Sequence, residues 1–143
     1  MSAPDFYFVV NSTARHLHDE YGMETLVDFW RSLGQEYYSK RYRKWREGGL
    51  QGIADDWQEY FLHEPGAEVE TTVDQHAVHL DIGVCPAIKH LRDSGREIVP
   101  YFCEHCDHTC GSMAEAAGYK FSRSGGMGAC HQTFSISNKS VGK

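Results

Sequence analysis

Residues 68–84 read Glu-Val-Glu-Thr-Thr-Val-Asp-Gln-His-Ala-Val-His-Leu-Asp-Ile-Gly-Val, and this stretch decides the fold. Aliphatic and polar residues alternate over 69–73 and again over 78–82, with a turn near Asp74-Gln75. A period of two is typical of strands with one buried face, so the stretch predicts a β-hairpin. His79 and Asp81 then lie on the face opposite the aliphatic residues.

A second hairpin is predicted near the C-terminal end. Residues 119–123 and 132–136 alternate in the same way, and the glycine-rich sequence 124–130 separates them. Glycine between two alternating segments is typical of a hairpin turn. The polar residues that follow predict a frayed tail over 138–143.

The first half of the chain has a helical pattern instead. Apolar residues recur at spacings of three and four from residue 26 to residue 37, which predicts an amphipathic helix that continues to residue 45. Gly48-Gly49 stops it, and a shorter helix is predicted over 53–62. The inward face of the longer helix comprises Leu26, Phe29, Trp30, Leu33 and Tyr37.

Shorter elements complete the expected fold. Pro86 at a first helical position predicts a helix over 86–94, and Gly118 suits the end of a helix over 112–117. Residues 98–102 suit either a further strand or an extended entry into the segment that follows. The sequence thus predicts an α+β fold in a single domain over 1–143, with a helical N-terminal half packed on an antiparallel sheet built from two hairpins.

The composition narrows the expected partners. The 143 residues are 41% hydrophobic, which favours a packed core over disorder. A net charge of −6 and the lack of any 18-residue apolar run predict neither a nucleic-acid nor a membrane partner. The N-terminus lacks the pattern of a signal peptide, so a cytoplasmic protein with reduced thiols is expected. The expected partner is a small-molecule substrate, and a homo-oligomer is left open.

Residues 103–110 read Cys-Glu-His-Cys-Asp-His-Thr-Cys and hold three of the five cysteines. In a helix the three thiols share one face, and in a loop the Cys-x2-Cys spacing is suited to closing on a metal ion. Thiolates and imidazoles are ligands for zinc, iron and iron–sulfur clusters. The candidate metal ligands are Cys103, Cys106, Cys110, Cys130, His105 and His108, with Cys85 as an alternative fourth thiol.

Nucleophilic catalysis is the second interpretation of the thiols. Cys85 precedes Pro86 and therefore begins a predicted helix, where the helix dipole favours a thiolate. His79 and Asp81 on the preceding strand would supply a base and the group that orients it. A third interpretation is that the buried thiols have no chemical role and the domain is a scaffold for a partner.

The order of several short motifs over roughly residues 20–137 is informative. They are Leu-Gly-Gln-Glu-Tyr-Tyr at 33–38, Cys85-Pro86, Tyr101-Phe-Cys103, Ala-Gly-Tyr-x-Phe-x-Arg at 117–123, and Gly128-x-Cys130-x-x-x-Phe134. This order resembles the L-2-amino-thiazoline-4-carboxylate hydrolase-like family and, more distantly, 4-vinyl-reductase-type ligand-binding domains.

The resemblance implies hydrolytic opening of a thiazoline ring to an N-carbamoyl amino acid. Cys85, Cys103 and Cys130 match the motif cysteines of the family. Cys106 stands where the family more often has an acidic residue, and Cys110 is an addition. These two thiols would suit a metal site rather than a thiol hydrolase.

Two functions therefore stand as hypotheses. The first is a small hydrolase of cyclic amidines, in which a carboxylate such as Asp81, Glu104 or Asp107 holds the amidine nitrogens and a histidine moves the proton. Its catalytic candidates are Cys85, His79, Asp81 and Asp107. The second is a metal- or iron–sulfur-binding redox or sensor protein without hydrolase activity.

Overall fold

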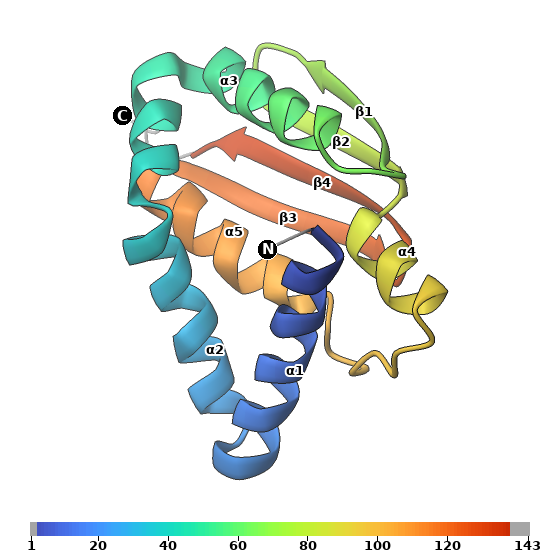
Figure 1. The fold of residues 1–143 in the computed structure, drawn as a ribbon. Coiled ribbons are helices and arrows are strands. Elements are labelled where there is room, and N and C mark those ends of the chain that lie inside the picture. Colours follow the sequence, from blue (N-terminus) through green and yellow to red (C-terminus); the bar gives the residue numbers. More distant parts are fainter. Residues whose placement is uncertain (1–2, 138–143) are drawn as a thin grey trace.

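The computed structural model describes residues 3–137, and within them five α-helices and one π-helical segment accompany a four-stranded antiparallel sheet (Figure 1). The predicted α+β fold, with a helical N-terminal half followed by two packed hairpins, is confirmed. The tail predicted over 138–143 lies outside the described residues.

The sheet is made of the two predicted hairpins. β1 (Glu68–Val73) pairs with β2 (Ala77–Val84), and β3 (Tyr119–Gly126) pairs with β4 (Ala129–Ile136). The hairpins join through β2 and β4, where Leu80 pairs with Gln132, so the strand order is β1-β2-β4-β3. This junction brings Cys85, just after β2, close to the hairpin turn before β4: the Cys85 amide donates to the Gly128 carbonyl at 2.9 Å.

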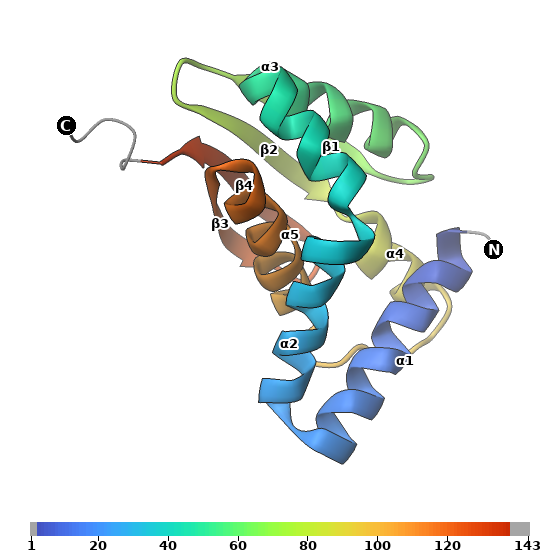
Figure 2. The same ribbon diagram turned by 90° about the vertical axis from the view of Figure 1, so that its left-hand side faces the viewer.

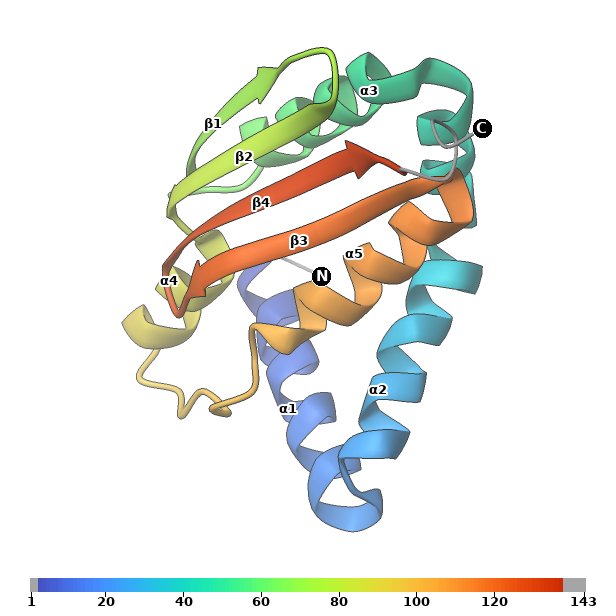
Figure 3. The same cartoon turned by 180° about the vertical axis from the view of Figure 1, so that it is seen from behind.

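Alternation along β2 and β4 gives the sheet two different faces. We call the side with Val78, Leu80, Ile82, Gln132 and Phe134 the inner face, and each of these residues is buried. The outer face carries the intervening residues, which are His79, Asp81, His131 and Thr133. Seen from behind, in Figure 3, no helix of the described chain covers the outer face.

The helices gather on the inner side. α3 (Ser39–Leu62) and α5 (Glu104–Ala117) pack against the sheet, and α4 (Pro86–Asp93) follows β2 directly. α1 (Ala3–Tyr21) and α2 (Met23–Ser32) run side by side and extend away from the sheet (Figure 2). None of the helices within residues 3–137 is long and apolar enough to cross a membrane.

Two hydrophobic clusters hold these layers together. The first lies between the sheet, α3 and α5 and includes Trp45, Trp57 and Phe134. The second lies among α1, α2, α4 and the segment before α5, and it includes Leu26 and Trp30. Cys85 packs against both clusters, so it lies where the two cores meet.

The helix predicted without a break from residue 26 to residue 45 is interrupted. α2 ends at Ser32, and a π-helical segment, η1 (Leu33–Tyr37), follows it. The Tyr38 amide donates to the Leu33 carbonyl at 3.0 Å, so this turn holds one residue more than an α-helical turn. The extra residue rotates the chain, and Tyr37, predicted to face inward, is 75% exposed.

Other predicted boundaries have clearer outcomes. α3 has a kink at Gly49, whose φ of 69° is outside the helical range, so the predicted interruption at Gly48-Gly49 is confirmed. Residues 98–102 form no strand: they lead through turns into α5, where the Phe102 amide donates to the Val99 carbonyl at 3.0 Å. Of the two conformations weighed for residues 103–110, the helix is present from Glu104 onward.

Candidate functional site

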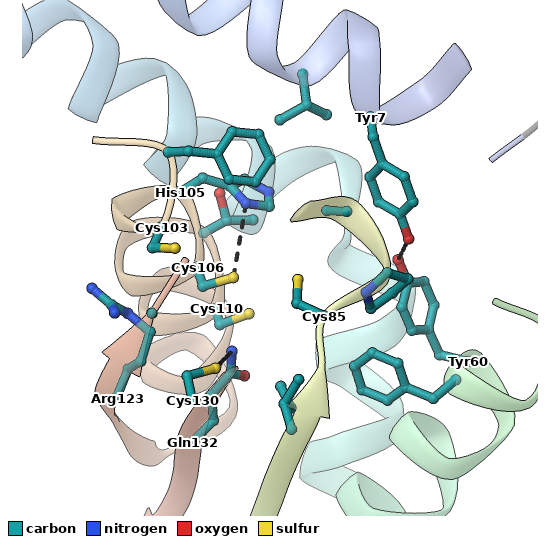
Figure 4. Close-up of a pocket in the computed structure, with 18 of the residues that line it drawn as sticks. Tyr7, Tyr60, Cys85, Cys103, His105, Cys106, Cys110, Arg123, Cys130 and Gln132 are labelled. Carbon is teal, nitrogen blue, oxygen red and sulfur yellow. Dashed lines mark hydrogen bonds between the residues drawn. The ribbon is translucent and has the colours of Figure 1, made fainter. Parts of the chain in front are cut away.

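All five cysteines line one cavity between the inner face of the sheet, α1, α3 and α5 (Figure 4). Its volume is about 170 Å³, and its walls are mostly aromatic and aliphatic. We call it the thiol pocket. Besides the cysteines, its lining includes Tyr7, Trp57, Phe61, Phe102, His105 and Gln132.

Three different elements bring the thiols to the pocket. Cys85 occupies the N-cap position of α4, and Cys130 lies on β4 opposite Ile82. Cys103 occupies the N-cap position of α5 without a capping hydrogen bond from its side chain, while Cys106 and Cys110 follow on the helix itself. Because α5 is helical, the spacings of three and four residues between these cysteines place their thiols on one side of it.

Burial keeps several of these thiols protonated. Burial raises the pKa of Cys85, although the amides at the start of α4 oppose the rise, and it raises the pKa of Cys130 to about 11. The pKa of Cys106 is also raised, first by its hydrogen bond with Cys110 and then by burial. At neutral pH these three side chains are therefore neutral thiols in the resting protein.

Cys106 also has a basic partner. Its Sγ lies 3.8 Å from Nδ1 of His105, and this contact lowers the pKa of Cys106 against the larger effects that raise it. His105 lines the pocket as well. The pair therefore has the two components of thiol activation, a proton donor and an adjacent imidazole.

Cys103 lies in a more polar part of the pocket. Its Sγ accepts a hydrogen bond from the Met127 amide at 3.2 Å and contacts the Met127 thioether at 3.9 Å. Met127 belongs to the turn between β3 and β4 and has a φ of 54°. That turn therefore forms the wall of the pocket next to Cys103.

Asp107 does not line the pocket, although the sequence marks it as a catalytic candidate. Its two carboxylate oxygens accept from Nε and Nη2 of Arg123, each at 2.8 Å. This bidentate pair raises the pKa of Arg123. Asp107 therefore anchors α5 to β3 at the margin of the pocket.

His108 is also outside the pocket. Its ring stacks on Trp30 with centroids 6.0 Å apart, and its Nε2 lies 3.9 Å from a Glu104 oxygen. The candidate metal ligands therefore divide: the four thiols and His105 surround one cavity, and His108 does not join them.

His79 and Asp81 lie on the outer face and do not meet Cys85, which lies on the inner side of the sheet. Asp81 accepts a hydrogen bond from Nδ1 of His131 at 2.6 Å, and His79 contacts His131 and Asp74. The physical reason is strand alternation, which directs residues 79 and 81 away from the side on which Cys85 packs. The base and orienting group expected for Cys85 are therefore not at the pocket.

Thiols are suitable ligands for a soft metal ion, but the side chains of the pocket are not positioned to coordinate one together. Within residues 3–137 no three or more His, Cys, Asp or Glu side chains are placed to hold one ion. The geometry of the pocket is thus that of a small cavity bounded by thiols.

No sequence pattern had indicated that several of the residues lining the pocket belong to the site. The Tyr7 hydroxyl donates to Glu64 and lies 3.3 Å from the Tyr60 hydroxyl, which puts a polar pair at one end of the pocket. Burial raises the pKa of Tyr60 to about 12. Gln132, by contrast, alternates in phase with Phe134, so its inward position follows from the strand pattern.

The fold and the pocket define an α+β protein with a small, partly open cavity lined by cysteines. Comparisons with known protein families, with curated proteins and with solved structures find no match.

Proposed function

We propose that this protein binds a small, neutral, ring-sized electrophile in the thiol pocket and hydrolyses it, with cyclic amidines of the thiazoline type as the substrate class. The observation that carries the proposal is the lining of one ring-sized cavity by all five cysteines and an imidazole. An apolar cavity of about 150 Å³ holds one benzene molecule, so about 170 Å³ suits a five-membered heterocycle. The resemblance noted above supplies the reaction type.

The lining argues for a neutral substrate. Among the described residues that line the pocket there is no Asp or Glu. A protonated amidine would therefore be buried without a counter-ion, which is costly in free energy. The side-chain amide of Gln132, which offers both a donor and an acceptor, is suited to the polar edge of a neutral ring.

Cys106 is the proposed nucleophile, in place of Cys85. Its proton passes to Nδ1 of His105, and the thiolate adds to the amidine carbon of the ring. The carbon–sulfur bond of the ring then breaks, which leaves an S-linked isothiourea on Cys106 and a free thiol on the substrate after the proton returns. Water adds to the same carbon, the Cys106 thiol departs, and the product is an N-carbamoyl compound.

The experiment is an assay of the purified protein with the neutral free base of 2-aminothiazoline, read by mass spectrometry for product and for an adduct on Cys106. Cys106→Ser is expected to abolish turnover. Cys110→Ser, one turn further along the same helix, is the matched control and is expected to reduce turnover without abolishing it. Unchanged turnover in Cys106→Ser would overturn the assignment, and no turnover of any cyclic amidine by the native protein would overturn the function.

A thiolate-bound zinc or iron ion, or an iron–sulfur cluster, is the alternative proposal, and the density of thiols around Cys106 supports it. Cys85 and Cys130 are both close enough to Cys106 for electrostatic coupling between the thiols. Elemental analysis and an absorption spectrum of the same preparation test this alternative. Stoichiometric metal that disappears in Cys106→Ala would favour it over the thiol hydrolase.

A further inference from the structure

A row of four ionisable side chains crosses the outer face of the sheet, away from the thiol pocket. In order they are Asp74, His79, His131 and Asp81. Oδ2 of Asp74 lies 3.1 Å from Nε2 of His79, and Oδ1 of Asp81 lies 2.6 Å from Nδ1 of His131. Between the two rings, Nδ1 of His79 and Nε2 of His131 face each other at 3.3 Å.

The two carboxylates determine which ring nitrogens carry protons. An ionised carboxylate only accepts hydrogen bonds, so His79 donates from Nε2 and His131 donates from Nδ1. Asp74 is itself fixed in place, because its Oδ1 accepts hydrogen bonds from the His76 and Ala77 amides at 2.7 and 2.9 Å. In the neutral rings, the facing nitrogens are then both acceptors.

Two lone pairs that face each other at 3.3 Å repel each other unless a donor or a cation satisfies them. The Thr133 hydroxyl, 3.5 Å from Nδ1 of His79, can donate to one of them, but only a shared proton or a metal ion satisfies both at once. Two nitrogens bound at about 2.0–2.1 Å to one tetrahedral zinc ion lie about 3.3–3.4 Å apart, which matches the observed separation. The carboxylate on the far nitrogen of each ring is the arrangement that orients imidazoles toward a metal.

We propose that His79 and His131 form a binding site for a divalent transition-metal ion such as zinc, held between Nδ1 of His79 and Nε2 of His131 on the outer face of the sheet. Asp74 and Asp81 orient the two rings, and water completes the coordination. The strand pairing fixes the site, since His79 pairs with Thr133 and Asp81 pairs with His131. With side chains 30% and 40% exposed, both rings are open to solvent.

The site is independent of the proposed hydrolase activity, because it uses the opposite face of the sheet. The thiol pocket also offers zinc ligands, so total metal content does not distinguish the two. The measurement must therefore report on the histidine rings themselves.

The experiment is a zinc titration of ¹⁵N-labelled native protein, followed through the ring nitrogens of the histidines by NMR. Nδ1 of His79 and Nε2 of His131 are expected to shift together and to return on adding a chelator. His79→Gln and His131→Gln are each expected to remove the response of the remaining ring. Asp81→Asn is expected to weaken zinc binding about tenfold, since outer partners of metal-bound histidines contribute to affinity.

His16→Gln is the matched control, because His16 lies on α1, contacts Tyr21 and is remote from the sheet. It is expected to leave the response of the two rings unchanged. If the two rings respond to pH but not to zinc, they share a proton only and the metal site is refuted. A zinc response of His79 that persists in His131→Gln would equally refute the paired site.

Discussion

The inner and outer faces of the same four-stranded sheet place ionisable groups in opposite environments, one buried and one exposed to solvent. On β4, Cys130 and Gln132 face the helices, whereas His131 and Thr133 face away from them. Burial on the inner side raises the pKa of the Cys130 thiol, whereas on the outer side imidazoles and carboxylates contact one another and remain open to solvent. Side chains of one strand therefore contribute to two different sites, because successive residues of a strand point to opposite faces of the sheet.

The largest expected effect is the loss of stability when a buried side chain of the inner face is truncated, compared with truncation of a neighbouring side chain on the outer face. Phe134 is fully buried on the inner face and contacts Trp45, Trp57 and Phe121. Phe134→Ala is expected to reduce the free energy of unfolding by about 3–5 kcal/mol, since it leaves a cavity. Thr133→Ala, the neighbouring outward residue, is the control and should change it by about 0.5 kcal/mol or less. Equal losses in urea unfolding would contradict the division into faces.

The next largest effect is expected from a substitution that tests how closely η1 packs against α5 in the helical layer. A Cβ on Gly34 would lie 2.6 Å from the Thr109 carbonyl oxygen and 2.8 Å from Cβ of Ser112. Gly34→Ala therefore forces η1 away from α5 and is expected to cost about 1–3 kcal/mol in the free energy of unfolding. Gly111→Ala, on α5 where an added Cβ meets no atom within 4 Å, is the control. A Gly34→Ala protein as stable as the native one would show that this contact is not tight.

The pH dependence of stability should differ in sign between the faces. The pKa of Cys130 is about 11 in the folded protein against an ordinary value of 9.0, so its contribution is present below pH 9 and is lost as the pH rises toward 11. The lowered pKa of Asp74 has the opposite result: its contribution is present above the ordinary value of 3.8 and is lost as the pH falls through its folded value.

Urea unfolding at several pH values measures both slopes. Cys130→Ala is expected to flatten the alkaline decline and to leave the acid decline unchanged, and Asp74→Asn is expected to do the reverse. An alkaline decline that persists in full in Cys130→Ala would assign it to the other buried thiols.

The smallest effect concerns the exposed ion pair. The side chains of Asp81 and His131 are 58% and 40% exposed, and exposed pairs contribute about 1 kcal/mol or less. Asp81→Asn is therefore expected to change thermal stability slightly while zinc affinity falls. Loss of stability comparable to that of Phe134→Ala would mean that the outer face carries part of the core.

The sequence predicted the two hairpins because Val69–Val73 and Val78–Ile82 show a clean period of two. It did not predict η1, which packs at Gly34 against α5 through contacts between residues 75 positions or more apart, and no local pattern records such contacts. The expected inward position of Tyr37 was wrong for the same reason.

The site was predictable in part. The helical spacing of Cys103, Cys106 and Cys110 implied a shared direction, and the structure brings Cys85 and Cys130 to the same cavity. The acid and base groups expected to act with these thiols could not be predicted, because their positions depend on the fold. Strand alternation separates His79 from Cys85, and Asp107 pairs with Arg123. No local pattern marked Tyr7, which reaches the pocket only because α1 folds back against α4.

The position of Cys85 between the two hydrophobic clusters has a thermodynamic consequence. A molecule in the thiol pocket would contact aromatic residues of both clusters, Trp57 in one and Tyr7 in the other, and would serve as interior packing for each. Unfolding of either half would then release the molecule. At a ligand concentration one hundred times Kd, its binding would raise the free energy of unfolding by about 2.7 kcal/mol. The sheet with α3 and α5 and the bundle of α1, α2 and α4 would melt as one unit when the pocket is filled.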